Sequence, residues 1–83
     1  MCFWIVLLRH GENTTRLRLT ENPDALVSNG SVACIGGFKT EHAALQIQTE
    51  WQQARGLDSR INTGQDICKR LMLPFYVVAT VKA

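Results

Sequence analysis

A continuous apolar run near the start of the chain, Phe3–Leu8 (FWIVLL), constrains the fold most strongly. The run is too short for a helix, and it is rich in the aromatic and branched side chains that favour extended strands. Apolar residues occupy both sides of its period-two repeat, so both faces need cover. We therefore expect a strand that is buried on both faces.

A second strand is predicted at Arg16–Thr20, where apolar and polar residues alternate strictly. Leu17 and Leu19 point to one side, and the arginines and threonine point to the other, as in a half-buried strand. The intervening segment contains Gly11 and Asn13, which are typical of turns. The two strands are thus predicted to form a hairpin.

The clearest helix signal lies in the middle of the chain. Thr40 is a candidate N-cap, Glu41 lies in the first turn, and Arg55-Gly56 closes the segment. Between these ends, apolar residues recur at spacings of three and four, as on the buried stripe of an amphipathic helix. The stripe consists of Ala44, Ile47, Trp51 and Ala54.

A second, shorter helix is expected to begin at Thr63, to bury Ile67 and Leu71, and to stop before Pro74. Its start is indicated by Asp66, three residues after Thr63. Shorter patterns predict the remaining elements. They are a helical turn through Leu26 that ends at Asn29-Gly30, a strand at Val32–Ile35 that Gly36-Gly37 stops, and a last strand at Phe75–Val81.

The length of 83 residues predicts a single domain over positions 1–83. Because each helix has only one apolar stripe, the economical packing places the helices on one face of one sheet. The predicted fold class is α+β. It has a small mixed or antiparallel β-sheet, made of the N-terminal hairpin and two further strands, with two helices packed on it.

Composition limits the classes of function. The apolar fraction of 46% and the formal charge of +2 are typical of a globular chain without a strongly basic nucleic-acid face. Cys2, Cys34 and Cys68 form no CxxC pair, so no metal or redox site is indicated. An odd cysteine count, with no secretory signal and no membrane-length apolar run, predicts a cytoplasmic protein. No metal or cofactor is expected, since the metal-binding and redox spacings of cysteine are missing.

The tetrapeptide Arg9-His10-Gly11-Glu12 directly follows the first expected strand. It resembles the RHGE signature of the histidine phosphatase and phosphoglycerate mutase family, in which the histidine takes up a phosphoryl group and arginines hold the phosphate. That family also needs a second histidine motif and a longer sheet, and nothing around His42 matches that motif. The alternative interpretation is a polar hairpin turn.

A second resemblance covers more of the chain. Trp4-Ile5-Val6 and Arg16-Leu17-Arg18 lie on the two hairpin strands with nine residues between them. Thr20-Glu21-Asn22-Pro23 follows, and Gly37–Leu45 (GFKTEHAAL) leads into the long helix. In this order and spacing, the segments resemble a GIY-YIG nuclease domain, particularly the small single-domain members and the structure-specific endonuclease subunits.

The functional residues of that family do not carry over. Its two tyrosines and its second glycine fall on Val6, Arg16 and Arg18, and its metal-binding glutamate falls on Gln48, whose neutral amide lacks the anionic oxygen that Mg²⁺ prefers. The resemblance therefore implies a pseudo-nuclease with no catalytic residues. The degenerate active-site positions are Trp4, Val6, Arg16, Arg18, Ala25, Leu26 (both in place of the helix arginine) and Gln48.

These patterns predict a non-catalytic interaction module that binds a protein partner or itself, with a homodimer favoured by the small core. Arg9, Arg16 and Arg18 form a candidate binding patch, which is alternatively a solvated outer face. The other functions left open are a nucleic-acid-binding module, a weak metal-dependent nuclease, and a phosphoryl-transfer enzyme that uses His10. No membrane partner is expected.

Overall fold

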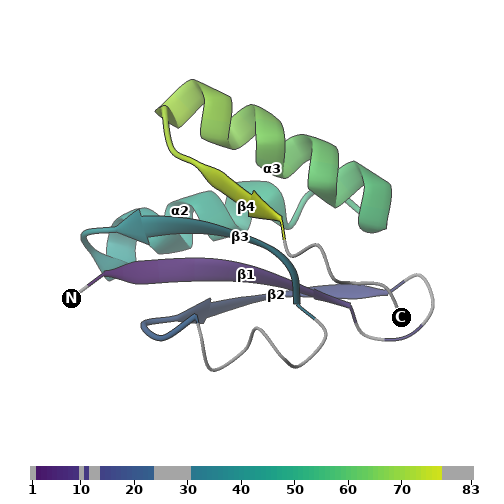
Figure 1. The fold of residues 1–83 in the computed structure, drawn as a ribbon, viewed down its shortest axis with the longest axis horizontal. Coiled ribbons are helices and arrows are strands. Elements are labelled where there is room, and N and C mark those ends of the chain that lie inside the picture. Colours follow the sequence, from purple (N-terminus) through teal and green to yellow (C-terminus); the bar gives the residue numbers. More distant parts are fainter. Residues whose placement is uncertain (1, 10, 12–13, 24–30, 78–83) are drawn as a thin grey trace.

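The computed structural model describes residues 2–9, 11, 14–23 and 31–77 (Figure 1). The described strands form one antiparallel sheet in the order β2-β1-β3-β4. The α+β prediction is confirmed, and the antiparallel alternative for the sheet is the correct one. The elements are β1 (Phe3–Arg9), β2 (Thr15–Thr20), β3 (Ser31–Phe38), α2 (Glu41–Trp51), α3 (Leu57–Leu71) and β4 (Phe75–Val77).

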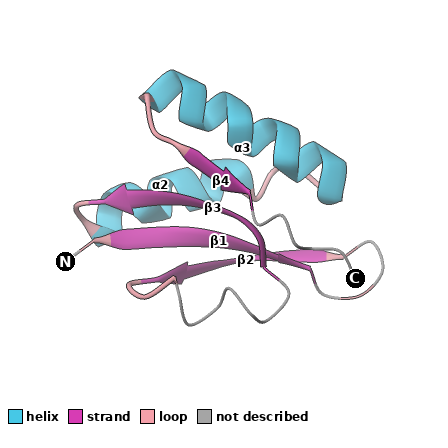
Figure 2. Ribbon diagram, in the orientation of Figure 1, coloured by secondary structure: helices cyan, strands magenta, loops and turns pink. Residues whose placement is uncertain are grey.

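Both described helices lie on the same side of the sheet, as expected from their single apolar stripes (Figure 2). Helix α2 contacts β1, β2 and β3, while α3 contacts β3 and β4. The side chains between these layers form one hydrophobic core. Its most deeply buried members are Ile5, Leu7, Ala33, Ile35, Ala44, Trp51 and Ile67.

Trp51 is the largest side chain in this core and is fully buried. Its indole N–H donates a hydrogen bond to the carbonyl oxygen of Arg60 at 2.8 Å, and its ring meets the ring of Phe75 edge-on at 6.3 Å. Helix α3 approaches closely at Gly64, where a Cβ would lie 2.6 Å from Phe75 Cε1 and 2.9 Å from Trp51 Cζ2. The absence of a side chain at this position therefore sets how closely α3 packs.

Strand β1 is buried on both faces, as its sequence predicts. Ile5 and Leu7 face the helices, and Val6 is only 1% exposed on the opposite face. Trp4 lies on this second face, where its ring is 6.0 Å from that of Tyr76. Consecutive residues of β4 thus contact different tryptophans, because Phe75 meets Trp51 on the helix side.

The predicted end of β3 at Gly36-Gly37 is wrong, since the strand continues to Phe38. The indole of Trp4 crosses this glycine pair, and a Cβ at Gly36 would overlap its ring. The glycines therefore provide space for a neighbouring side chain instead of breaking the strand. A contact between two strands that are distant in sequence decides this boundary.

The Thr40 N-cap of α2 is confirmed, because its hydroxyl oxygen accepts a hydrogen bond from the backbone N–H of Ala43 at 3.1 Å. The helix ends at Trp51, however, and not at Arg55-Gly56. Gly56 has a φ of 90°, which favours glycine, and it directly precedes α3. The glycine that appeared to close one helix therefore marks the start of the next.

Helix α3 begins at Leu57, so the predicted start at Thr63 is wrong. Ile67 is buried as expected, whereas Leu71 is 37% exposed and does not join the core. The predicted helical turn through Leu26 and the part of the last strand beyond Val77 lie outside the described residues. Neither α2 nor α3, the helices of the described part, combines the length and apolarity that a bilayer span requires.

Candidate functional site

Four of the degenerate active-site positions share the face of the sheet that points away from the helices. In the β1–β2 register, Val6 is opposite Arg18, and Leu8 is opposite Arg16. Residues paired in this way lie on the same face. Trp4 precedes Val6 by two positions and therefore lies on that face too. The first and second triplets of the predicted site are thus adjacent.

Gln48 lies on the other side of the sheet. It belongs to α2, and its side-chain amide donates a hydrogen bond to the carbonyl oxygen of Leu17 at 3.4 Å. The structure therefore does not bring Gln48 together with Val6 and Arg16 on one surface. Ala25 and Leu26 lie outside the described residues. Over the described ranges, no three histidine, cysteine or acidic side chains gather as metal ligands would.

Glu50, two residues after Gln48, forms an ion pair with Arg70 of α3. Both carboxylate oxygens accept hydrogen bonds from the guanidinium group at 2.8 Å. These bonds, together with the positive charge of Arg70, lower the pKa of Glu50 although slight burial opposes the change. This carboxylate is therefore already engaged within the domain.

The predicted arginine patch is divided between the two faces. Arg16 and Arg18 point away from the helices, whereas Arg9 is opposite Thr15 in the register and shares its side of the sheet. All three arginines are exposed. No carboxylate among the described residues forms an ion pair with any of them.

Arg60 of α3 is a central residue that the sequence patterns did not reveal. Its NH1 group donates to the carbonyl oxygen and the hydroxyl oxygen of Thr15, at 3.0 and 2.9 Å. Its Nε–H donates to the carbonyl of Ala54 at 2.8 Å, and NH2 donates to that of Gln52 at 3.4 Å. One side chain therefore ties α3 to the edge strand β2 and to the end of α2.

Among the described residues, no carboxylate forms an ion pair with Arg60, and the hydrogen-bond partners of its guanidinium group are all neutral oxygens. Burial is the main cause that lowers the pKa of the Arg60 guanidinium, and the nearby charge of Arg55 lowers it further. A bound anion would offset both effects.

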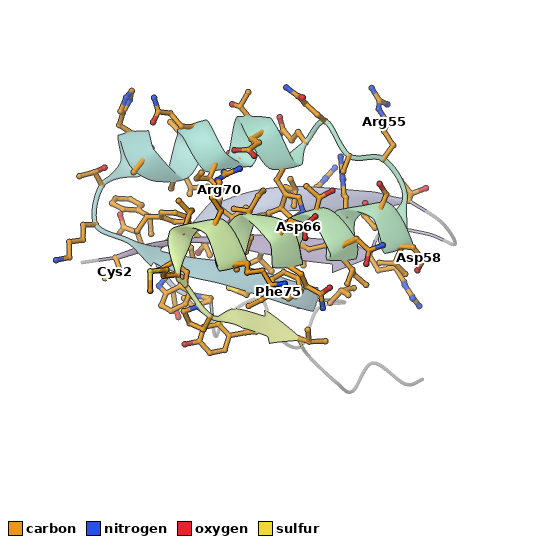
Figure 3. The ribbon with its side chains drawn as sticks, turned by 90° about the horizontal axis from the view of Figure 1, so that it is seen from above. Cys2, Arg55, Asp58, Asp66, Arg70 and Phe75 are labelled. Atoms are coloured by element: carbon orange, nitrogen blue, oxygen red, sulfur yellow. The ribbon has the colours of Figure 1, made fainter. Side chains whose placement is uncertain are left out.

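An open hollow of about 370 Å³ lies beside Arg60, where β2 meets the turn between α2 and α3. We call it the arginine hollow. Among the described residues, its lining includes three arginines and no carboxylate; these lining residues are Thr14, Thr15, Arg16, Leu17, Gln52, Arg55 and Arg60. Figure 3 shows Arg55 extending from the turn away from the body of the domain. This hollow is a candidate site formed by described residues.

Two other sequence candidates are not associated with the arginine hollow. His10 and Glu12 of the RHGE segment lie outside the described residues, and His42 is exposed in the first turn of α2. Cys2 is exposed, Cys34 is half-buried and Cys68 is buried. Cys68 is therefore the one thiol of the three that is shielded from solvent.

Comparison with known proteins gives no match. No family model matches the chain, and neither the curated proteins nor the solved structures include one that is significantly similar. The function is therefore inferred from the residues and geometry of this chain.

Proposed function

We propose that this chain is a non-catalytic interaction module, on a GIY-YIG-like scaffold, that binds an acidic segment of a protein partner. The observation that carries the proposal is the arginine hollow, which brings Arg55 and Arg60 together with no carboxylate among the described residues of its lining. These two arginines come from the α2–α3 turn and from α3, and Arg16 of β2, whose side chain points away from the helices, is a further lining residue. An acidic segment would supply the missing negative charge at an exposed and accessible place.

The scaffold part of the proposal is supported by the order of elements. A paired N-terminal hairpin is followed by a strand that carries Gly37-Phe38, and then by a helix that is capped by Thr40. The same order was expected from the resemblance. The resemblance requires Gln48, Val6 and Arg16 to share one face, but Gln48 lies on the opposite side of the sheet from the other two. This separation counts against the resemblance at these positions and against a working catalytic site there.

Binding is favoured over catalysis by the chemistry of the same side chains. The amide of Gln48 is neutral and donates to a backbone carbonyl, so it cannot provide an anionic metal ligand. Val6 is a buried aliphatic side chain that can neither activate water nor stabilise developing charge. Arginines without a nearby base or nucleophile bind anions but do not cleave them.

A nucleic-acid strand is the second candidate partner. Arg16 and Arg18 share their face of the sheet with Trp4 and Tyr76, whose rings lie 6.0 Å apart. Tyr76 is 49% exposed, so part of its side chain is accessible to a ligand. Exposed aromatic rings beside arginines are the elements from which single-strand binding surfaces are built.

The test is a titration of a fluorescently labelled oligoglutamate peptide with the full chain. Arg55→Glu is expected to weaken binding about tenfold, since it removes one attraction and adds a repulsion. Lys39→Glu makes the same change in net charge at an exposed turn outside the hollow and should have little effect. Equal losses in the two variants would mean that only the net charge matters, and would contradict the proposal.

Two further measurements separate the alternatives. Preferential binding of a single-stranded oligonucleotide, with an affinity that falls steeply with salt, would favour the second candidate. Magnesium-dependent cleavage of branched DNA by the purified chain would instead show a working nuclease. Light scattering on the same samples determines whether the partner is a second copy of the chain.

A further inference from the structure

The guanidinium group of Arg60 is held in a fixed position at the wall of the arginine hollow. An arginine has five N–H donors. Hydrogen bonds to Ala54, Thr15 and Gln52 use four of them, one from Nε, two from NH1 and one from NH2. One N–H of NH2 is left for a ligand, together with the whole positive charge. The group is thus preorganised, so a ligand would not have to order it.

Arg55 places a second positive charge near the first. It is exposed in the turn between α2 and α3 and lines the same hollow as Arg60, and its charge lowers the pKa of Arg60. No described carboxylate of the neighbouring segments forms an ion pair with either arginine. Glu50 is engaged by Arg70, and Asp58, which is exposed in the first turn of α3, is not part of the lining (Figure 3).

The neutral lining residues add hydrogen-bonding groups suited to oxygen-rich ligands. The hydroxyl oxygen of Thr15 accepts from Arg60, which leaves its own O–H able to donate. Thr14 and Gln52 bring a second hydroxyl and a side-chain amide to the lining. Guanidinium and hydroxyl donors around an uncompensated charge are the groups that recognise phosphate.

We infer that the arginine hollow binds a phosphate monoester, carried by a phosphorylated side chain of the protein partner and held between Arg55 and Arg60. A phosphorylated side chain carries a charge of about −1.5 to −2 at neutral pH, whereas a carboxylate carries only one charge. The larger charge matches two arginines that form no ion pair within the described part of the chain. This inference rests on the proposed function and specifies the chemistry of the acidic partner.

The experiment compares three peptides of one sequence, with phosphoserine, glutamate or serine at the central position. Fluorescence anisotropy measures their binding to the full chain and to two variants. The phosphoserine peptide is expected to bind at least about fivefold more tightly than the glutamate peptide, which corresponds to one further exposed ion pair. Arg55→Gln should remove most of this preference, and Lys39→Gln, the matched control, should retain it.

The outcomes distinguish the inference from the function on which it rests. Equal binding of the phosphoserine and glutamate peptides, both above serine, would overturn the phosphate inference and leave the acidic partner intact. Failure of every peptide to bind would overturn both. Retention of the preference in Arg55→Gln, or its equal loss in Lys39→Gln, would show that the hollow is not the site. More effective competition by an oligonucleotide than by the phosphopeptide would assign the arginines to nucleic acid.

Discussion

Gly64 offers the sharpest test of how the helices pack on the sheet. In an ordinary helix interior, replacing glycine by alanine stabilises a protein by about 0.5–1 kcal/mol, because alanine loses less conformational freedom on folding. The Gly64→Ala side chain would instead meet two aromatic rings, with its Cβ 2.6 Å from Phe75 Cε1 and 2.9 Å from Trp51 Cζ2. Both contacts are too short to be accommodated without movement.

The movement is costly on one side of the contact in particular. Trp51 is fully buried, and its indole N–H is fixed to the carbonyl of Arg60 at 2.8 Å. Overpacking of a core typically costs about 1–3 kcal/mol. After subtraction of a gain of about 1 kcal/mol in helix propensity, Gly64→Ala is expected to lower the free energy of unfolding by up to about 2 kcal/mol.

Urea unfolding followed by circular dichroism measures this change. Asn62→Ala is the matched control, because Asn62 is exposed in the same helix. The control is expected to raise the free energy of unfolding by about 0.5 kcal/mol through helix propensity alone. If Gly64→Ala were as stabilising as Asn62→Ala, the close approach of α3 to Trp51 and Phe75 would be refuted.

Two further predictions concern polar and titratable side chains. Arg60→Gln should lower the free energy of unfolding, measured in urea, by about 1–3 kcal/mol, since it leaves carbonyl groups of β2 and of the end of α2 without their donor. Arg60→Lys should be destabilised to a similar extent, because lysine lacks the planar guanidinium group that makes these bonds. Burial, with a smaller effect of Cys68, raises the pKa of the Cys34 thiol from its ordinary 9.0 to about 11. The folded chain therefore retains a proton that the unfolded chain loses, so stability should fall as the pH rises from 9 to 11, and Cys34→Ser should reduce this fall. An unchanged decline in the urea midpoint of Cys34→Ser over that range would contradict the assignment.

The parts of the fold that depend on neighbouring residues could be predicted from the sequence. The apolar run of β1 and the alternation of β2 predict the hairpin. Because successive side chains of a strand point to opposite faces, the order of apolar and polar residues shows directly whether one face or both are buried. The N-cap of α2 is equally local, since Thr40 and Ala43 are three residues apart. For these elements, tertiary packing and local pattern agree.

The errors arise where distant residues decide the local structure. Gly36-Gly37 is a typical strand breaker in isolation. In the folded chain, however, the indole of Trp4 from the neighbouring strand occupies the space that side chains at these two positions would fill. The sequence pattern predicts the start of α3 too late, at Thr63, because Gly56 looks like the end of the preceding helix. Leu57 and Ile61, spaced by four and packed against the core, carry a periodic signal before Thr63 that could have located it.

The candidate site could be predicted only in part for the same reason. The exposed arginines of β2 were recognised from strand alternation. Arg60 was not, because its role depends on a contact with Thr15, which is 45 positions away. No spacing rule identifies such a pair. The placement of Gln48 beside Leu17, away from Val6, is likewise set by helix packing and has no sequence signature.

The short strand β4 has an experimental consequence, because it is flanked by the two indoles of the chain. Phe75 contacts Trp51 on the helix side, and Tyr76 contacts Trp4 on the other side. Each layer of the domain therefore contains its own intrinsic fluorophore. In two single-tryptophan variants, the emission spectrum would report the docking of β4 separately on the helix side, through Trp51, and on the opposite face, through Trp4, without any attached dye.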